Sequence, residues 1–170
     1  VSSVYDIEHN DFLESAVWSF SFDGTLRWIH RMDERPWVTL EHADEVWFGL
    51  GRPKCGFANI RGEDEFIHTK TKADSPITCG SAFDSGMGFG HANGSVSDES
   101  GATVAVEKSG IEHIDAFDSG YIAALEDGSV VARVDDENIW TTDGELVSIL
   151  AVGFDFEKKA TLWSGRWSGS

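Results

Sequence analysis

Three histidines of this sequence stand in the same five-residue pattern, each followed two residues later by an aspartate. The pattern, (Ile/Leu)-Glu-His-x-Asp, occupies residues 7–11, 40–44 and 111–115 and contains His9, His42, His113, Asp11, Asp44 and Asp115. In a strand, residues two apart point to the same face, so each His would share a face with its Asp. Imidazole and carboxylate groups in this arrangement can bind a cation or sugar hydroxyls, or form structural hydrogen bonds.

The recurrence of the pattern helps to separate these uses. A catalytic site needs its His once, whereas one copy per repeat suits a structural brace. One hypothesis is an axial metal site, in which repeated strands would bring His9, His42 and His113 together with Cys79. We favour the structural interpretation, in which each His bonds to a nearby Asp or to backbone and each Asp accepts backbone N–H bonds. We therefore predict no catalytic residue, no metal and no cofactor, with ligand binding by the six residues as the alternative.

The motif marks a longer repeat of roughly 35 residues. When residue 7 is aligned with residue 111, Asp23-Gly24 falls on Asp127-Gly128, and Asn93-Gly94 has the same place in a copy that begins at residue 77. Other copies begin at residue 40 and, with weaker similarity, near residue 146. These starts give approximate repeats at 3–36, 37–73, 74–108, 109–143 and 144–170.

Within one repeat, the pattern indicates β structure. The segment YIAALEDGSVVARV (residues 121–134) has two short apolar runs around an Asp-Gly pair, which is the strongest local signal for a hairpin. No stretch shows sustained helical periodicity with capping residues. We expect three or four antiparallel strands per repeat, and a single all-β domain over residues 1–170 that forms a small five-bladed β-propeller with the His motif on its innermost strands. A β-sandwich or jelly roll is the structural alternative.

The segment IDAFDSGYIAALEDGSVVARV (residues 114–134) resembles the repeats of the regulator-of-chromosome-condensation family. The shared features are a small-residue motif, an apolar strand, an Asp-Gly turn and a second apolar strand. The resemblance covers part of each repeat and implies a β-propeller. The sequence departs from that family because it lacks the glycine-rich signatures and has fewer, shorter repeats. It is similar in blade number to small five-bladed lectin propellers.

The acidic composition restricts the partners of this chain. It contains 30 Asp and Glu residues against 13 Lys and Arg residues, for a net charge of −17. Such a surface repels nucleic acid and anionic membranes, because both bind proteins through cationic side chains. It also suits concentrated salt, in which self-repulsion is screened, so we favour a halophilic source, with an ordinary acidic protein as the alternative. No apolar run approaches the roughly 20 residues that cross a bilayer, and residues 1–10 lack the features of a signal peptide.

These observations predict a non-catalytic protein–protein interaction or assembly module. A structural or surface-decoration subunit of a halophilic system, such as a virion protein, would fit, with other protein subunits as partners and a place at a virion or cell surface. The alternative is a lectin-like propeller that binds glycans through several weak sites. Enzymatic function is disfavoured because no nucleophile stands in a setting such as G-x-S-x-G. Cys55 and Cys79 match no zinc motif and are expected to be small buried thiols.

Overall fold

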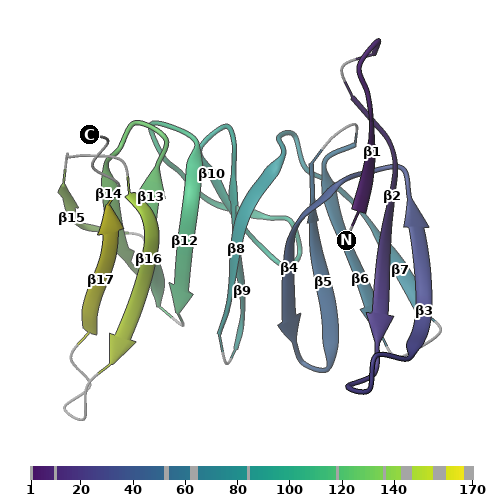
Figure 1. The fold of residues 1–170 in the computed structure, drawn as a ribbon. Helices are drawn as coiled ribbons and strands as arrows, with labels where there is room; N and C mark the ends of the chain where they lie inside the picture. Colours follow the sequence, from purple (N-terminus) through teal and green to yellow (C-terminus); the bar gives the residue numbers. More distant parts are fainter. Residues whose placement is uncertain are drawn as a thin grey trace. The chain divides into compact units, whose positions relative to one another are not determined.

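The described part of the chain consists of seventeen antiparallel strands in the computed structural model (Figure 1). The structure describes residues 2–9, 11–51, 54–61, 65–83, 85–117, 119–135, 137–142, 147–154 and 160–166. The strands are β1 (Ser2–Asp6), β2 (Asp11–Phe20), β3 (Leu26–Met32), β4 (Pro36–His42), β5 (Glu45–Leu50), β6 (Gly56–Arg61), β7 (Glu65–Lys72), β8 (Ile77–Phe83), β9 (Gly86–His91), β10 (Ser95–Asp98), β11 (Thr103–Val106), β12 (Ile111–Phe117), β13 (Gly120–Leu125), β14 (Val130–Val134), β15 (Glu137–Thr142), β16 (Val147–Phe154) and β17 (Ala160–Arg166).

Each sheet is built from strands that are consecutive in the sequence. Over the described residues the sheets are β1-β2-β3, β4-β5-β6-β7, β8-β9-β10-β11, β12-β13-β14-β15 and β16-β17. The prediction of an all-β fold with several antiparallel sheets is therefore confirmed. To within one residue at the strand ends, each sheet lies inside one of the five repeat segments. The single-domain organisation stays a prediction. Among the described residues, no helix has the length and apolar character needed to span a membrane.

Contacts divide the chain into two compact units, Val1–Ile77 and Thr78–Ser170. In the first unit, Val17 of β2 and Met32 of β3 pack with two pairs of side chains from the neighbouring sheet. These are Phe48 and Leu50 of β5, and Ala58 and Ile60 of β6. Burying each of the larger side chains contributes about 1.5–3 kcal/mol, so this cluster is a main source of stability for the unit.

In the second unit, β13 is buried on both of its faces. Tyr121, Ala123 and Leu125 belong to one apolar cluster, and Ile122 and Ala124 belong to another. The reason is that neighbouring sheets cover the β12–β15 sheet: β9 contacts β12, and β16 contacts both β12 and β13. A strand covered on two sides needs a continuous apolar run in place of alternation, which is what residues 121–125 provide.

The β2–β3, β9–β10 and β13–β14 hairpins share one turn, as the aligned Asp-Gly and Asn-Gly pairs predict. Gly24, Gly94 and Gly128 have φ angles of 86°, 88° and 85°, a left-handed conformation that glycine adopts at little cost. Each glycine N–H donates to the carbonyl three residues earlier, over 2.9, 3.0 and 2.9 Å. The preceding Asp or Asn accepts the N–H of the residue after the glycine, over 2.9, 3.0 and 3.0 Å. The predicted hairpins are therefore confirmed, each with a tight turn closed at a left-handed glycine.

The turn carboxylates make a testable contribution to acid stability. The hydrogen bonds of Ser129, first through its hydroxyl and then its N–H, and the nearby Lys108 lower the pKa of Asp127 to about 2. A lowered pKa stabilises the fold above the ordinary value of 3.8, and this contribution is lost as the pH falls through about 2. Asn93 makes the equivalent hydrogen bond in the β9–β10 turn, so an asparagine can replace Asp127 in the β13–β14 turn without titrating. We therefore expect the urea midpoint of Asp127→Asn to fall less between pH 4 and pH 2 than that of wild type. An Asp127 carboxyl that titrates near 3.8 by NMR would contradict this expectation.

A second recurring feature is a glycine, on the second strand of a sheet, that packs against an isoleucine later in the sequence. A Cβ added at Gly49 of β5 would lie 2.5 Å from Cγ2 of Ile77, and a Cβ added at Gly90 of β9 would lie 2.5 Å from Cγ2 of Ile111. Ile77 and Ile111 are both fully buried and both begin the first strand of a sheet. In both places a glycine on the second strand of a sheet leaves room for the isoleucine that begins the next repeat. This shared contact supports the alignment of residue 77 with residue 111.

The three copies of the His motif do not occupy equivalent positions. Residues 7–9 form the turn between β1 and β2, residues 40–44 end β4 and form the β4–β5 turn, and residues 111–115 lie inside β12. The prediction that the motif lies on a strand in every copy is therefore wrong, because the first copy falls in a turn.

Local backbone chemistry explains the difference. Asp6 accepts the N–H of Glu8 over 2.9 Å, which favours a turn directly after β1. Ala43 and Asp44 have φ angles of 50° and 64°, as the two central residues of a tight hairpin turn do.

Candidate interaction surfaces

The six motif residues lie in different surroundings. His9 is exposed, and its Nδ1 lies 2.6 Å from Oδ2 of Asp6, a hydrogen bond that lowers the pKa of the Asp6 carboxyl. His42 is half-buried and Asp44 is exposed, at the end of β4 and in the turn that follows.

In the third copy, His113 and Asp115 are both half-buried on β12, and Asp115 accepts a hydrogen bond of 3.1 Å from the Ser81 hydroxyl of β8. The side chain of Asp11 lies outside the described residues. Within the described part of the chain, no group of three or more His, Cys, Asp or Glu side chains is placed to hold a metal ion. Whether the six residues are structural or bind a ligand stays a prediction.

The two cysteines are not joined by a disulfide and lie in different environments. Cys55 is half-buried and Cys79 is buried. Burial raises the pKa of the Cys79 thiol to about 12, and its sulfur lies 3.8 Å from the carbonyl oxygen of Ile111. Because the thiolate is the reactive form of cysteine, Cys79 is a weak nucleophile in this setting.

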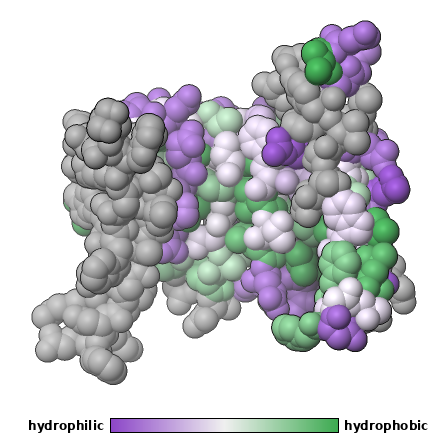
Figure 2. Space-filling model, viewed as in Figure 1, coloured by the Kyte–Doolittle hydropathy of each residue, from purple (hydrophilic) through white to green (hydrophobic). Residues whose placement is uncertain are grey.

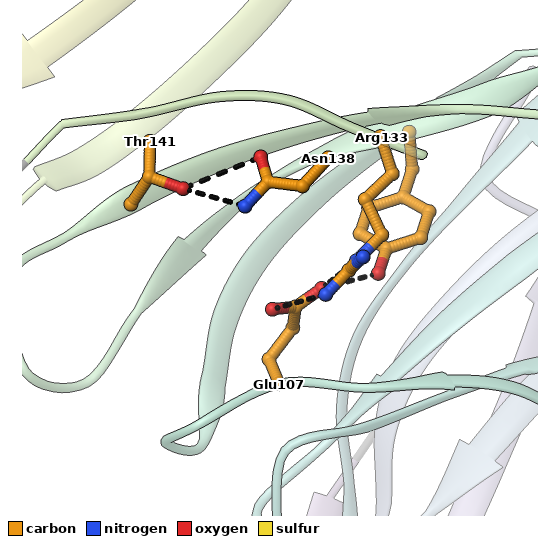
Figure 3. A network of polar contacts seen from close by, with 5 residues as sticks. Glu107, Arg133, Asn138 and Thr141 are labelled. Carbon is orange, nitrogen blue, oxygen red and sulfur yellow. Dashed lines mark hydrogen bonds and ion pairs between the residues drawn. The ribbon is translucent and has the colours of Figure 1, made fainter. Parts of the chain in front are cut away.

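A buried polar network connects the β8–β11 sheet with the β12–β15 sheet. Glu107, directly after β11, accepts a 2.5 Å hydrogen bond from Nε of Arg133 and a 2.6 Å bond from the Tyr121 hydroxyl. Figure 3 shows the Glu107 and Arg133 side chains pointing toward one another. The Glu107 side chain is 5% exposed and that of Arg133 is 24% exposed, so most of the ion pair is shielded from water.

The network keeps its charges fixed. Burial by itself raises the pKa of the Glu107 carboxyl, but the hydrogen bonds from Arg133 and Tyr121, with the Arg133 charge, leave that pKa below its ordinary value. Burial and the bond to Glu107 raise the pKa of Tyr121, and Glu107 raises that of Arg133. Near neutral pH the three groups therefore stay as carboxylate, phenol and guanidinium, which suits a structural brace better than proton transfer.

A related carboxylate braces the first unit. Glu45 is buried at the start of β5, and its carboxylate accepts a 2.6 Å hydrogen bond from the Asn59 amide and one of 2.5 Å from Nε of Arg61. Sequence analysis missed Glu45 and Glu107 among 30 acidic residues. For the pair of Glu107 and Arg133 the sequence did contain a usable signal. Arg133 interrupts the apolar run VVARV, and a cation inside such a strand needs an anionic partner.

The β2–β3 hairpin carries an apolar surface, which we call the hairpin surface. Phe20 and Leu26 are cross-strand partners, as are Trp18 and Ile29, and Phe22 lies in the turn. Phe20 is 58% exposed, Leu26 is 46% exposed, and Phe22 is completely exposed. In Figure 2, hydrophobic residues gather over the β2–β3 end of this unit. Single exposed apolar residues are common on proteins, but a group of neighbouring ones such as this is a candidate interaction surface.

A hollow adjoins the hairpin surface within the same unit. It has a volume of about 390 Å³ and is lined by Trp18 and Phe20 of that surface, together with Trp28, Val46 and Phe48. Aromatic side chains beside a concave apolar region are the features that concentrate binding energy in protein interfaces. The hairpin surface and its hollow are therefore the best candidate site of the first unit.

Comparison with known proteins shows the class of fold. No family model and no curated protein matches the chain. Similar solved structures support an all-β repeat fold for this chain. The resemblance to regulator-of-chromosome-condensation repeats stays a prediction.

The individual matches are distant in sequence. Sqt1 of Saccharomyces cerevisiae has a TM-score of 0.71 and 12% identity, over 92% of this chain and 52% of that chain. The computationally designed proteins Ika4 and Ika8 have TM-scores of 0.58 and 0.59, at 13% and 14% identity. The match to Ika4 covers 78% of this chain and 92% of Ika4. The match to Ika8 covers 95% of this chain and 52% of Ika8. This chain thus spans about half the length of Sqt1, and these likenesses concern the fold alone.

Proposed function

We propose that this chain is a non-catalytic protein-interaction module that docks a partner protein through the hairpin surface. The observation that carries the proposal is the contiguous exposure of Phe20, Phe22 and Leu26 on a hairpin held by a buried core. Burying the fully exposed Phe22 would gain about 1.5–3 kcal/mol, and burying the remaining exposed surface of Phe20 and Leu26 would gain about half as much for each. A partner that covers them recovers this free energy, and the rigid sheet limits the entropy lost on binding.

The proposal predicts that aromatic side chains of the hairpin dominate partner binding. Tagged protein would capture its partner from the native source, and the partner, identified and purified, would be titrated against wild type and Phe20→Ser/Phe22→Ser. We expect at least a tenfold rise in Kd, about 1.4 kcal/mol, because aromatic anchors concentrate interface energy. The unfolding midpoint should change only a little, because Phe22 is fully exposed and Phe20 is more than half exposed.

Ile139→Ser is the matched control, since Ile139 is 55% exposed but lies on β15 of the other unit. The control variant should bind as wild type does. Equal affinity of the partner for the hairpin double variant and for wild type would refute the proposed docking site.

We further propose that the five sheets are blades of a propeller that closes into a ring. The recurring glycine turns and the recurring packing of Ile77 on Gly49 and Ile111 on Gly90 support this arrangement. Ring closure would cover sheet faces but leave turns such as that of Phe22 in contact with solvent. A closed ring should have a radius of gyration near the roughly 16 Å expected for a compact chain of this length. A clearly larger value from X-ray scattering would exclude closure.

A surface subunit of an assembly in concentrated salt, such as a virion protein, is the specific form of this function that we favour. The support is the net charge of −17, which strains a fold in dilute buffer and is screened in molar salt. The unfolding midpoint should therefore rise from 0.1 M to 2 M KCl. A midpoint that is independent of salt would remove this support.

Carbohydrate binding is a second candidate because of one side chain. Trp37 is 41% exposed, and its indole lies where a side chain at Gly51 would stand, so one ring face is packed and the ring is held in place. A fixed aromatic ring can stack on the apolar face of a sugar. Binding on a glycan array that is lost in Trp37→Ala and kept in Phe20→Ser/Phe22→Ser would favour this candidate over protein docking.

A further inference from the structure

The second unit contains a groove between the β8–β11 and β12–β15 sheets. Its volume is about 240 Å³. Small residues line part of it: Gly88 of β9 lies so close to β12 that an added Cβ would be 2.9 Å from Cβ of Ala116, and Gly120 lines the same space. Larger apolar side chains form the walls, namely Phe83, Met87, Val104, Ile114, Phe117 and Tyr121.

The walls of the groove are preorganised. The Tyr121 hydroxyl is already bonded to Glu107, so the ring presents carbon atoms to the groove while its polar end is satisfied. Met87 and Ile114 are almost fully buried, whereas Val104 on β11 is 49% exposed and stands at the open side. An occupant would therefore enter beside Val104 and contact aromatic and aliphatic surface without rearrangement of the sheets.

The size of the groove favours a single side chain as the occupant. Pockets for small organic ligands usually measure about 300–1,000 Å³ and bury most of the ligand. A space of about 240 Å³ is smaller and fits one large side chain, such as an aromatic anchor of a protein segment.

The charges around the groove define the flanks of that segment. Asp98 lines the groove, and an Oε atom of Glu99 lies 3.4 Å from the N–H nitrogen of Met87. From residue 78 to residue 135 the sequence has ten acidic and two basic residues, Lys108 and Arg133. Both cations are held by carboxylates, Lys108 by Asp127 at 3.0 Å and Arg133 by Glu107 at 2.5 Å. The margin of the groove is therefore negative, and a segment with Lys or Arg beside its anchor is electrostatically complementary to it.

We propose that this groove binds a basic protein segment by taking up one aromatic side chain flanked by Lys or Arg. The site goes beyond the hairpin surface because it is formed entirely by residues of the second unit. It would give the chain a second contact with the same partner or a contact with another one.

Short peptides test the proposal directly. The full chain, labelled with ¹⁵N, would be titrated with blocked peptides of sequence Lys-Lys-Trp-Lys-Lys, Lys-Lys-Ala-Lys-Lys and Glu-Glu-Trp-Glu-Glu at low salt. We expect the first peptide to shift the amide signals of Met87, Val104 and Ala116 with a Kd at least tenfold below those of the other two. Equal binding of the first two peptides would mean that charge alone drives association and would overturn the proposal. The absence of shifts at these three amides would also overturn it.

Two charge-matched variants locate the binding. Val104→Arg places a cation at the open side of the groove and should weaken binding of the Trp peptide at least tenfold. Val106→Arg adds the same charge on β11, at an exposed residue that does not line the groove, and should weaken binding less than threefold. Equal loss in both variants would overturn the proposal. Phe20→Ser/Phe22→Ser should bind the peptide as wild type does, because the hairpin surface is not part of the groove. Loss of peptide binding therefore tests the groove, and loss of partner binding in that variant tests the hairpin surface.

Discussion

Replacement of Glu107 by Ala should destabilise the protein by about 3 kcal/mol, the lower end of the range for breaking a buried ion pair. The variant leaves the Arg133 guanidinium and the Tyr121 hydroxyl without their shared acceptor. The lower end applies because the Arg133 side chain is 24% exposed and water can solvate part of it. Urea denaturation at pH 7 measures the difference.

The exposed pair of Asp33 and Lys54 is the matched control. Its atoms are 3.6 Å apart and both side chains are largely exposed, so Asp33→Ala should cost less than about 0.5 kcal/mol. If Glu107→Ala and Asp33→Ala cost the same, the polar network does not stabilise the fold.

The contribution of Glu107 should also depend on pH. Its folded pKa is lowered, so its stabilising effect is present above the ordinary value of 4.5 and is lost as the pH falls below that value. The difference in stability between wild type and Glu107→Gln should therefore shrink from pH 5 downward. A difference that grows on acidification would contradict the assigned direction of the pKa shift.

Replacement of Gly90 by Ala should destabilise the protein by about 2 kcal/mol, within the usual cost of overpacking a core. The added Cβ would lie 2.5 Å from Cγ2 of Ile111 and 2.6 Å from Sγ of Cys79, closer than carbon atoms can approach. The better strand propensity of Ala offsets part of this cost, by roughly 0.5–1 kcal/mol. Urea denaturation measures the net effect.

A double variant separates overpacking from other effects of the substitution. Ile111→Ala removes the Cγ2 atom, the nearest that the new methyl group would meet, but keeps Cβ of residue 111 at 2.7 Å and leaves Sγ of Cys79 in place. Gly90→Ala/Ile111→Ala should therefore recover part of the overpacking cost and be more stable than the sum of the single effects predicts. Gly49→Ala tests the repeat in the first unit, where Ile77 takes the place of Ile111. A strictly additive double variant would show that contact with Ile111 is not the source of the cost. A neutral Gly49→Ala would show that the two glycine–isoleucine contacts are not equivalent.

The features predicted correctly from the sequence are local ones. The turns at Gly24, Gly94 and Gly128 depend on a glycine with positive φ and on the residue before it, and both are visible in the sequence. The apolar runs on either side of Asp127-Gly128 likewise predict the β13–β14 hairpin, whereas burial of residues 121–125 on both faces is seen only in the structure. Strands and hairpins could therefore be predicted without knowledge of tertiary contacts.

The features that could not be predicted depend on register and on contacts between sheets. The letters Glu-His recur at residues 8–9, 41–42 and 112–113, but a strand begins where its partners allow, so the copies fall in a turn, at a strand end and inside a strand. The role of Glu107 depends on Tyr121 and Arg133 of the next sheet, which no spacing reveals. The hairpin surface was also missed, because the exposure of Phe20 follows from which face of β2 is covered and that of Phe22 from its place in the turn.

Site-specific photocrosslinking in the native source tests docking through the hairpin surface most directly. A benzophenone amino acid would replace Phe22 in one variant and Ile139 in another, since both positions are exposed and lie in different units. Our account predicts a discrete protein adduct of constant mass from position 22 and none from position 139. No adduct at position 22, or the same adducts from both positions, would contradict it.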